Sequence, residues 1–168
     1  MTSWWGYGAP ILAAATGVVV ESEDDMPDQM PVSTITPVPG REPGNHVVED
    51  IGGGRYILYA HMKPGSIPSW VRKGARLTAG VLIGRLGSSG NSGVPHLHFQ
   101  VMDSPSFADS TGLPFVFDTQ LLAGTIAESA VSDFGQGAPV TIDRTEAGVR
   151  RNQMSARDGV FGYNLSPQ

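Results

Sequence analysis

Residues 45–61 read NHVVEDIGGGRYILYAH, and this stretch decides the fold class. Two runs rich in β-branched and aromatic residues, 45–51 and 55–61, flank the triplet Gly52-Gly53-Gly54. Glycine accepts the positive φ angles of tight turns, and such residues on both sides favour paired strands. The stretch therefore predicts an antiparallel hairpin whose second strand ends at His61.

Further strands are expected on both sides of this hairpin. Residues 9–21 divide into two short strands that pivot at Thr16-Gly17, residues 81–86 form another, and a short one lies around residues 115–117. The sequence carries neither a strong helix signal nor a repeat of fixed period. We therefore predict an all-β fold, a compact antiparallel β-sheet or sandwich with long surface loops.

One of these loops follows the first strands. Glu23-Asp24-Asp25 and the proline-rich residues 27–43 lack apolar periodicity, which is typical of a surface loop. The acidic residues lack the spacing of an EF-hand, so we interpret them as solvated. This loop is a candidate wall for a cleft.

Composition bounds the class of protein. A chain of 168 residues fits one ordinary domain, which we place at residues 1–125, followed by a C-terminal extension at 126–168 with an edge strand and a flexible tail. A net charge of -5 argues against a nucleic-acid partner. No apolar run approaches the roughly 20 residues of a membrane span, and residues 1–5 do not resemble a signal peptide. The absence of cysteine excludes disulfides and thiol nucleophiles.

The strongest chemical signal is the glycine-rich turn at residues 87–93, GSSGNSG, followed at 95–99 by PHLHF. His96 and His98 are two residues apart, so on an extended segment both side chains point to the same face. Neutral imidazole binds zinc and titrates near neutrality. The pair therefore suits a metal ion with a neighbouring proton-transfer group.

Taken in order, these segments resemble the lysostaphin-type (LytM-type) zinc endopeptidases, which cleave peptide cross-bridges of bacterial peptidoglycan. The similarity rests on residues 8–19, 55–61, 74–84 and 87–99, and it extends over about residues 8–103. The family's fold is the duplicated hybrid motif, in which a cleft is floored by a sheet and walled by loops. The resemblance implies a peptidoglycan peptide as substrate, Zn²⁺ as cofactor and a location in the cell envelope or outside the cell.

The same resemblance implies roles for three histidines. His98 matches the zinc-binding histidine of the family, and His61 and His96 match catalytic histidines that assist proton transfer beside the metal-bound water. The family completes its zinc site with an upstream His-x-x-x-Asp motif. Only residues 1–7 precede the matched region here, and they contain no His, Asp or Glu. One of the three protein ligands of a usual catalytic zinc site is therefore expected, and two are not.

Two functions stay open on the sequence. The first is a zinc endopeptidase, with the upstream motif on a further N-terminal segment or with a site rebuilt from His61, His96 and His98 or from acidic side chains of residues 21–28. The second is a non-catalytic domain that binds a peptide or regulates a cell-wall hydrolase. The remaining histidine, His46, is flanked by valines and is expected to serve ordinary sheet pairing.

Overall fold

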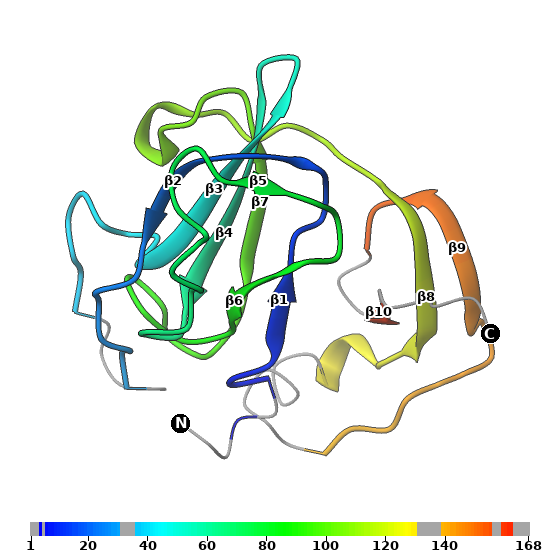
Figure 1. The fold of residues 1–168 in the computed structure, drawn as a ribbon. Helices are drawn as coiled ribbons and strands as arrows, with labels where there is room; N and C mark the ends of the chain where they lie inside the picture. The colour runs from blue at the N-terminus through cyan, green and yellow to red at the C-terminus, as the bar shows by residue number, and fades with distance from the viewer. Residues whose placement is uncertain (1–3, 5, 31–35, 131–138, 156–158, 163–168) are drawn as a thin grey trace. The chain divides into compact units, whose positions relative to one another are not determined.

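The structure is a computed structural model that describes residues 4, 6–30, 36–130, 139–155 and 159–162. The chain forms two compact units, Met1–Leu113 and Pro114–Gln168. Figure 1 labels the strands of both units. The domain boundary expected after residue 125 stays a prediction, whereas the compact units divide after Leu113.

The first unit is built from antiparallel strands in two sheets. Strands β5, β2, β3, β4 and β7 form a five-stranded sheet in that order, and β1 pairs with β6. The strands of this unit are β1 (Pro10–Leu12), β2 (Gly17–Glu23), β3 (Asn45–Gly52), β4 (Arg55–Met62), β5 (Arg76–Leu77), β6 (Leu82–Arg85) and β7 (His98–Met102).

The hairpin expected at residues 45–61 is confirmed as β3 and β4, which run side by side in Figure 1. Gly52, Gly53 and Gly54 all have positive φ angles, of 82°, 64° and 68°. A side chain would strain this backbone region, which explains the glycine triplet. The two strands expected within residues 9–21 and the strand expected at 81–86 are present as β1, β2 and β6.

One face of the five-stranded sheet carries the candidate functional site that is described below. Val48, Leu58, Ala60 and Met102 form a buried cluster, and Phe107 packs against it. Across the β4 and β7 pair, Leu58 faces Gln100 and Ala60 faces His98. Because side chains alternate along a strand, His98 and Gln100 project from the same face as this cluster.

The opposite face is tied to the first strands by a buried tyrosine. The Tyr59 hydroxyl accepts a hydrogen bond from the Ala14 backbone N–H at 2.8 Å and donates one to Glu49 Oε2 at 2.8 Å. Tyr59 and Glu49 are both fully buried. The loop after β1 is therefore held against the central hairpin.

The second unit is a small antiparallel sheet with the order β10, β8, β9. Its strands are β8 (Phe117–Thr125), β9 (Gly148–Gln153) and β10 (Gly159–Gly162). The sequence anticipated only a short strand near residues 115–117, whereas β8 has nine residues. The tail that the sequence predicts to be flexible includes 156–158 and 163–168, which lie outside the described residues.

The expectation of an all-β fold is confirmed. Helical structure in the described ranges consists of two 3-10 turns, η1 (Phe107–Asp109) and η2 (Glu128–Ala130). In the part of the chain that the structure describes, no helix has both the length and the apolar content needed to cross a bilayer.

Candidate functional site

The three histidines singled out by the sequence come together in the first unit. His61 lies near the end of β4, His98 begins β7, and His96 lies in the loop just before β7. The ring centroids of His61 and His96 are 4.7 Å apart, and those of His61 and His98 are 5.8 Å apart. The extended strand expected to carry both His96 and His98 therefore starts only at His98, and His61 lies close to both rings.

The position of His61 depends on an unusual backbone conformation. Its φ angle is 62°, a region that non-glycine residues rarely adopt and that costs about 1–3 kcal/mol. The His61 N–H donates to the Pro43 carbonyl at 2.9 Å, and its carbonyl accepts from the Gly87 N–H at 3.1 Å. Two loops thus hold the residue in this conformation and aim its ring toward the other histidines.

Hydrogen bonds select one tautomer for each neutral ring. His61 Nδ1 lies 2.8 Å from the carbonyl oxygen of Ser89, and His96 Nδ1 lies 2.8 Å from the carbonyl oxygen two residues before it. His98 Nε2 lies 3.0 Å from Gln100 Oε1. These oxygens only accept hydrogen bonds, so these nitrogens carry the protons. The lone pairs are left on Nε2 of His61, Nε2 of His96 and Nδ1 of His98.

The environment of His61 keeps its ring neutral. Burial lowers the pKa of His61 to about 4, and the neighbouring His96 adds to the shift because two imidazolium charges would repel each other. The hydrogen bond to the Ser89 carbonyl acts in the opposite direction but is weaker than burial. At neutral pH His61 is therefore a proton acceptor with its Nε2 lone pair available.

Two loops pack backbone against backbone beside the histidines. Gly44 and Gly90 have φ angles of 64° and 68°, and a Cβ atom on Gly44 would lie 2.5 Å from the Gly90 nitrogen. The Asn91 N–H donates to the Glu42 carbonyl at 2.9 Å. Glycine is required at both positions because neither the conformation nor the space admits a side chain. The loop expected to form a cleft wall is thereby anchored to the glycine-rich turn.

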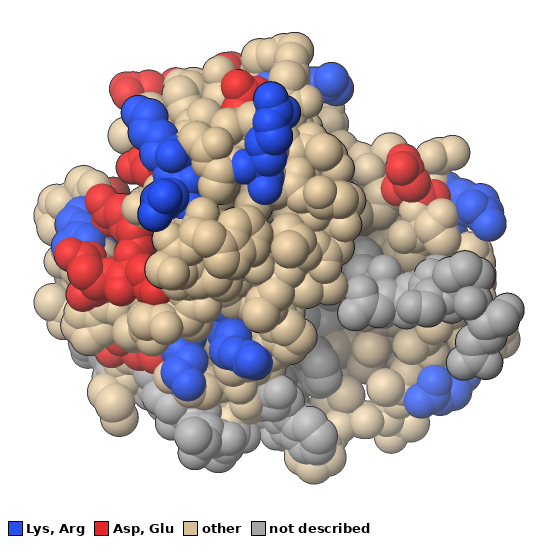
Figure 2. Space-filling model, in the orientation of Figure 1, with Lys and Arg blue, Asp and Glu red and all other residues tan. Residues whose placement is uncertain are grey.

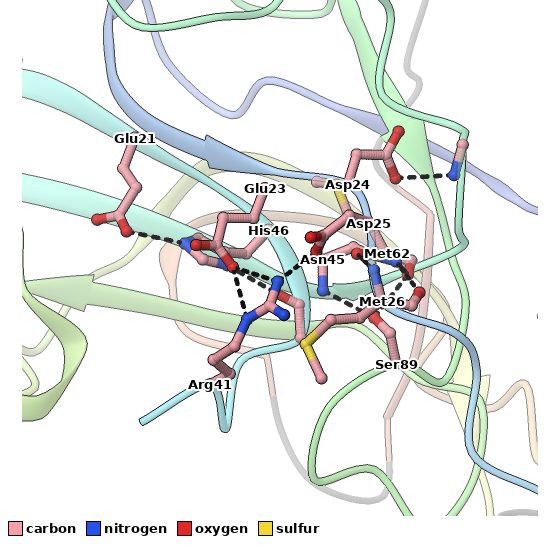
Figure 3. A network of polar contacts seen from close by, with 12 residues as sticks. Glu21, Glu23, Asp24, Asp25, Met26, Arg41, Asn45, His46, Met62 and Ser89 are labelled. Atoms are coloured by element: carbon pink, nitrogen blue, oxygen red, sulfur yellow. Dashed lines mark hydrogen bonds and ion pairs between the residues drawn. The ribbon is translucent and has the colours of Figure 1, made fainter. Parts of the chain in front are cut away.

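Ser89 and Asn45 complete this anchor, as Figure 3 shows. The Asn45 N–H donates to Ser89 Oγ at 2.9 Å, and that hydroxyl donates to the Met62 carbonyl at 2.7 Å. The Asn45 side chain also accepts from the Met26 N–H at 2.8 Å. Ser89 is fully buried, so its carbonyl oxygen is a rigid acceptor for the His61 ring.

A hollow of about 180 Å³ opens beside the rings, and we name it the histidine hollow. The Phe107 ring meets His98 edge to face, with centroids 5.8 Å apart. The hollow is lined among others by Glu42, Pro43, Leu58, His61, His98 and Phe107. The wall expected from the long loop is confirmed by Glu42 and Pro43.

The described residues do not by themselves form a metal centre. In the described ranges, no three His, Asp or Glu side chains are arranged to hold a metal ion. This finding runs against a site rebuilt from the three histidines alone. His98 still fits a single ligand position, because Gln100 holds its ring and leaves Nδ1 free, as outer partners of metal-binding histidines do.

The acidic side chains at the end of β2 and just after it, those of Glu23, Asp24 and Asp25, have partners of their own. Glu23 and Asp25 both pair with Arg41, and Asp24 accepts from the backbone N–H groups of Gly65 and Ile67 at 2.9 and 3.0 Å. These three side chains therefore stabilise loops.

The sequence profile of Peptidase family M23 matches residues 5–110, which is more than half of the chain. The chain belongs to peptidase family M23. This match lies within the first unit, so the second unit falls outside the M23 match. The resemblance to lysostaphin-type peptidases is thereby confirmed.

Solved structures of M23 and related peptidases are also similar to this chain. The catalytic domain of lysostaphin from Staphylococcus simulans is 28% identical, with 65% of this chain and 70% of that chain covered and a TM-score of 0.47. The catalytic domain of the prophage-encoded M23 protein EnpA from Enterococcus faecalis is 25% identical, with coverages of 63% and 68% and a TM-score of 0.44. A zinc containing peptidase from Vibrio cholerae is 25% identical, with coverages of 64% and 28% and a TM-score of 0.44. No curated protein matches the sequence.

Some residues around the three histidines were not singled out from the sequence. Gln100 lies two residues after His98, so strand alternation alone would have placed both on one face. Phe107 and the Ser89 carbonyl carry no such signal, because their contacts with His98 and His61 depend on how distant segments pack.

Proposed function

We propose that this chain is an endopeptidase-type domain for the peptides of bacterial peptidoglycan, with the histidine hollow as the position of the cleaved bond. The observation that carries the proposal is the set of three converging imidazoles, each with one nitrogen engaged and one lone pair open. Such an arrangement, in a chain of the M23 family, suits proton transfer at an amide.

In this proposal His61 and His96 handle protons. The neutral His61 ring takes a proton from the attacking water through Nε2, and His96 orients the water or stabilises the developing oxyanion. His98 offers Nδ1 as one zinc ligand. Zinc, held by His98 together with further ligands, would supply an activated water.

The site of action follows from the proposed substrate. Peptidoglycan peptides are found at the cell envelope, so we expect the protein to act there or outside the cell. The net charge of -5 leaves nucleic acid an unsuitable partner.

Zinc binding and peptide hydrolysis test the proposal together. We expect calorimetry to detect zinc binding that His98→Ala abolishes, and zinc-loaded protein to release new amino termini from purified peptidoglycan. Tryptophan fluorescence of the variant checks that it remains folded. Zinc binding that is unchanged by His98→Ala would contradict the role of His98, and folded, zinc-loaded protein without hydrolysis would contradict the enzymatic function.

A non-catalytic, peptide-binding domain is the second candidate. The observation that favours it is the lack of a three-residue metal group among the described residues. This candidate predicts that peptidoglycan fragments bind the chain and shift the imidazole signals of His61 and His98, while no amino termini are released with zinc present.

A further inference from the structure

Positive charge is concentrated in one part of the first unit. Residues 51–102 contain no Asp or Glu, although the chain as a whole carries a net charge of -5. More than half of the 11 Lys and Arg residues lie in this range, namely Arg55, Lys63, Arg72, Lys73, Arg76 and Arg85. Three of them fall within residues 72–76, which belong to the segment between β4 and β5 or to β5 itself.

An exposed aromatic side chain accompanies these three cations. Trp70 is 45% exposed, which is unusual for so large an apolar side chain. Arg72, Lys73 and Arg76 are exposed as well. We name Trp70, Arg72, Lys73 and Arg76 the basic platform. Figure 2 shows Lys and Arg side chains gathered over the region that β2 and β5 occupy in Figure 1.

Backbone hydrogen bonds hold the basic platform against β2. The Gly74 N–H donates to the Val19 carbonyl at 2.7 Å, and the Val19 N–H donates to the Ala75 carbonyl at 2.8 Å. Val71, between two members of the platform, is 2% exposed and anchors the loop in the core. The platform is therefore arranged before a ligand arrives, and less free energy is lost in ordering it on binding.

The three cations of the platform are not neutralised within the described part of the chain. The ion pairs found there are those of Arg41 and His46, and none involves Arg72, Lys73 or Arg76. Asp50 lies on β3, beyond β2 from Arg76, and its Oδ1 accepts from the nearby Gly52 N–H. Three positive charges are thus available to an anion from outside.

Protection of a sheet edge explains only part of this surface. Arg76 belongs to β5, an edge strand, and a charged side chain there discourages pairing with another chain. Arg72 and Lys73 precede that strand. The exposed indole of Trp70 has the opposite effect, because it offers apolar area to a partner. An indole beside three available cations therefore indicates a ligand that has both rings and negative charge.

We propose that the basic platform binds an anionic polysaccharide. The Trp70 indole offers a flat apolar face to the C–H groups of a sugar ring and an N–H donor to its hydroxyls. The guanidinium groups of Arg72 and Arg76 match carboxylate or phosphate groups along the polymer. Nucleic acid also combines rings with charge, but its closely spaced phosphates suit a chain of net charge -5 poorly.

The basic platform and the histidine hollow lie at different edges of the five-stranded sheet. The platform lies at the β5 edge, and His98 begins β7, which is the opposite edge. Four strand spacings separate these edges, a distance of about 19 Å. A bound polysaccharide therefore leaves the histidine hollow open, and the inference does not depend on the proposed function.

Short polymers that separate charge from sugar test the inference. The probes are an oligogalacturonate, its methyl ester and an oligoglutamate with the same number of carboxylates, and calorimetry measures their binding to the full chain at low salt. We expect the oligogalacturonate to bind at least about tenfold more tightly than the uncharged ester, and more tightly than the oligoglutamate. A phosphodiester-linked hexose oligosaccharide of equal charge shows whether phosphate or carboxylate is preferred.

Two charge-matched triple variants assign the binding site. Arg72→Gln, Lys73→Gln and Arg76→Gln together should weaken binding of the oligogalacturonate at least about fivefold and flatten its salt dependence. Arg144→Gln, Arg150→Gln and Arg151→Gln together change the net charge equally in the second unit and should leave binding unchanged.

The role of the indole is read from the unsubstituted chain. The indole N–H signal of Trp70, assigned by its loss in Trp70→Phe, should shift when the oligogalacturonate binds. Equal binding of the acid and its ester overturns the inference, as does an equal loss in the two triple variants. An unshifted Trp70 signal overturns it too, and so does tighter binding of a single-stranded DNA of the same charge. Each result leaves the proposed function intact, because the three histidines are unchanged throughout.

Discussion

Gly90→Ala is the substitution whose cost the structure defines most sharply. Gly90 has a φ angle of 68°, and a Cβ atom at this position would overlap the Gly44 nitrogen and lie 2.5 Å from the Glu42 carbonyl oxygen. Both neighbours are backbone atoms, which cannot rotate away as a flexible side chain can. The two loops that carry the walls of the histidine hollow would have to separate.

Two penalties add at this position. The left-handed conformation costs a residue with a Cβ atom about 1–2 kcal/mol, and overpacking costs about 1–3 kcal/mol more. We therefore expect Gly90→Ala to lower the free energy of unfolding by about 2–5 kcal/mol. The matched control is Gly80→Ala, because Gly80 has a φ angle of 87° but nothing within 4 Å of a Cβ atom. Only the conformational penalty applies there.

Urea denaturation followed by tryptophan fluorescence measures both effects. The three tryptophans, Trp4, Trp5 and Trp70, all lie in the first unit, so the signal reports on the unit that contains the substitutions. With a slope of about 2 kcal/mol/M, the midpoint of Gly90→Ala should fall by about 1–2.5 M. Equal midpoints for Gly90→Ala and Gly80→Ala would refute the close approach of the two loops.

Three further predictions concern polar side chains of the central sheet. Burial raises the pKa of Glu49, whose Oε1 has no hydrogen-bond partner among the described residues, so the folded state resists its ionisation. The free energy of unfolding should therefore fall as pH rises above 4.5. Urea titrations at several pH values measure this fall, and Glu49→Gln should reduce it. An equal fall in Glu49→Gln and in the unchanged protein would contradict the prediction. The pKa of His61 is lowered to about 4, so stability should fall by up to about 3 kcal/mol as pH drops from 6.5 toward 4 in the presence of a chelator. His61→Gln should remove that loss, and its persistence would show that another group titrates. Gln100→Leu should abolish the preference of His98 for a proton on Nε2, measured by nitrogen NMR of the imidazole, whereas Gln100→Glu should retain it; identical spectra for both variants would contradict the assigned hydrogen bond.

The parts of the fold predicted from the sequence are those that depend on near neighbours in the chain. The hairpin of β3 and β4 follows from two runs of strand-forming residues around three glycines, and all three glycines have the positive φ angles that such a turn requires. Strand β8 was not predicted from the sequence beyond its first residue, Phe117. Its sequence after Phe117 mixes small, polar and apolar residues, and it is a strand because β9 and β10 pair with its two edges.

The candidate site divides in the same way. His61, His96 and His98 could be selected from the sequence because their residue type and order match the motifs of the family. Their mutual distances and the nitrogen atom that each ring leaves open could not, because partners far apart in the chain set the orientation of His61 and the approach of the rings. His61, for example, is oriented by a carbonyl oxygen 28 residues away.

The sequence by itself determined that the chain is all-β, that it resembles lysostaphin-type peptidases and that His61, His96 and His98 are its candidate site residues. Local patterns and ordered motifs are sufficient for these conclusions, because strand propensity, turn glycines and residue type act over a few residues. Only the tertiary structure decided that the three rings converge and that a hollow opens beside them. Gly44 and Gly90 approach each other closely and join the two loops beside the rings, and the positive φ of His61 orients its ring. Both features arise from packing between distant segments.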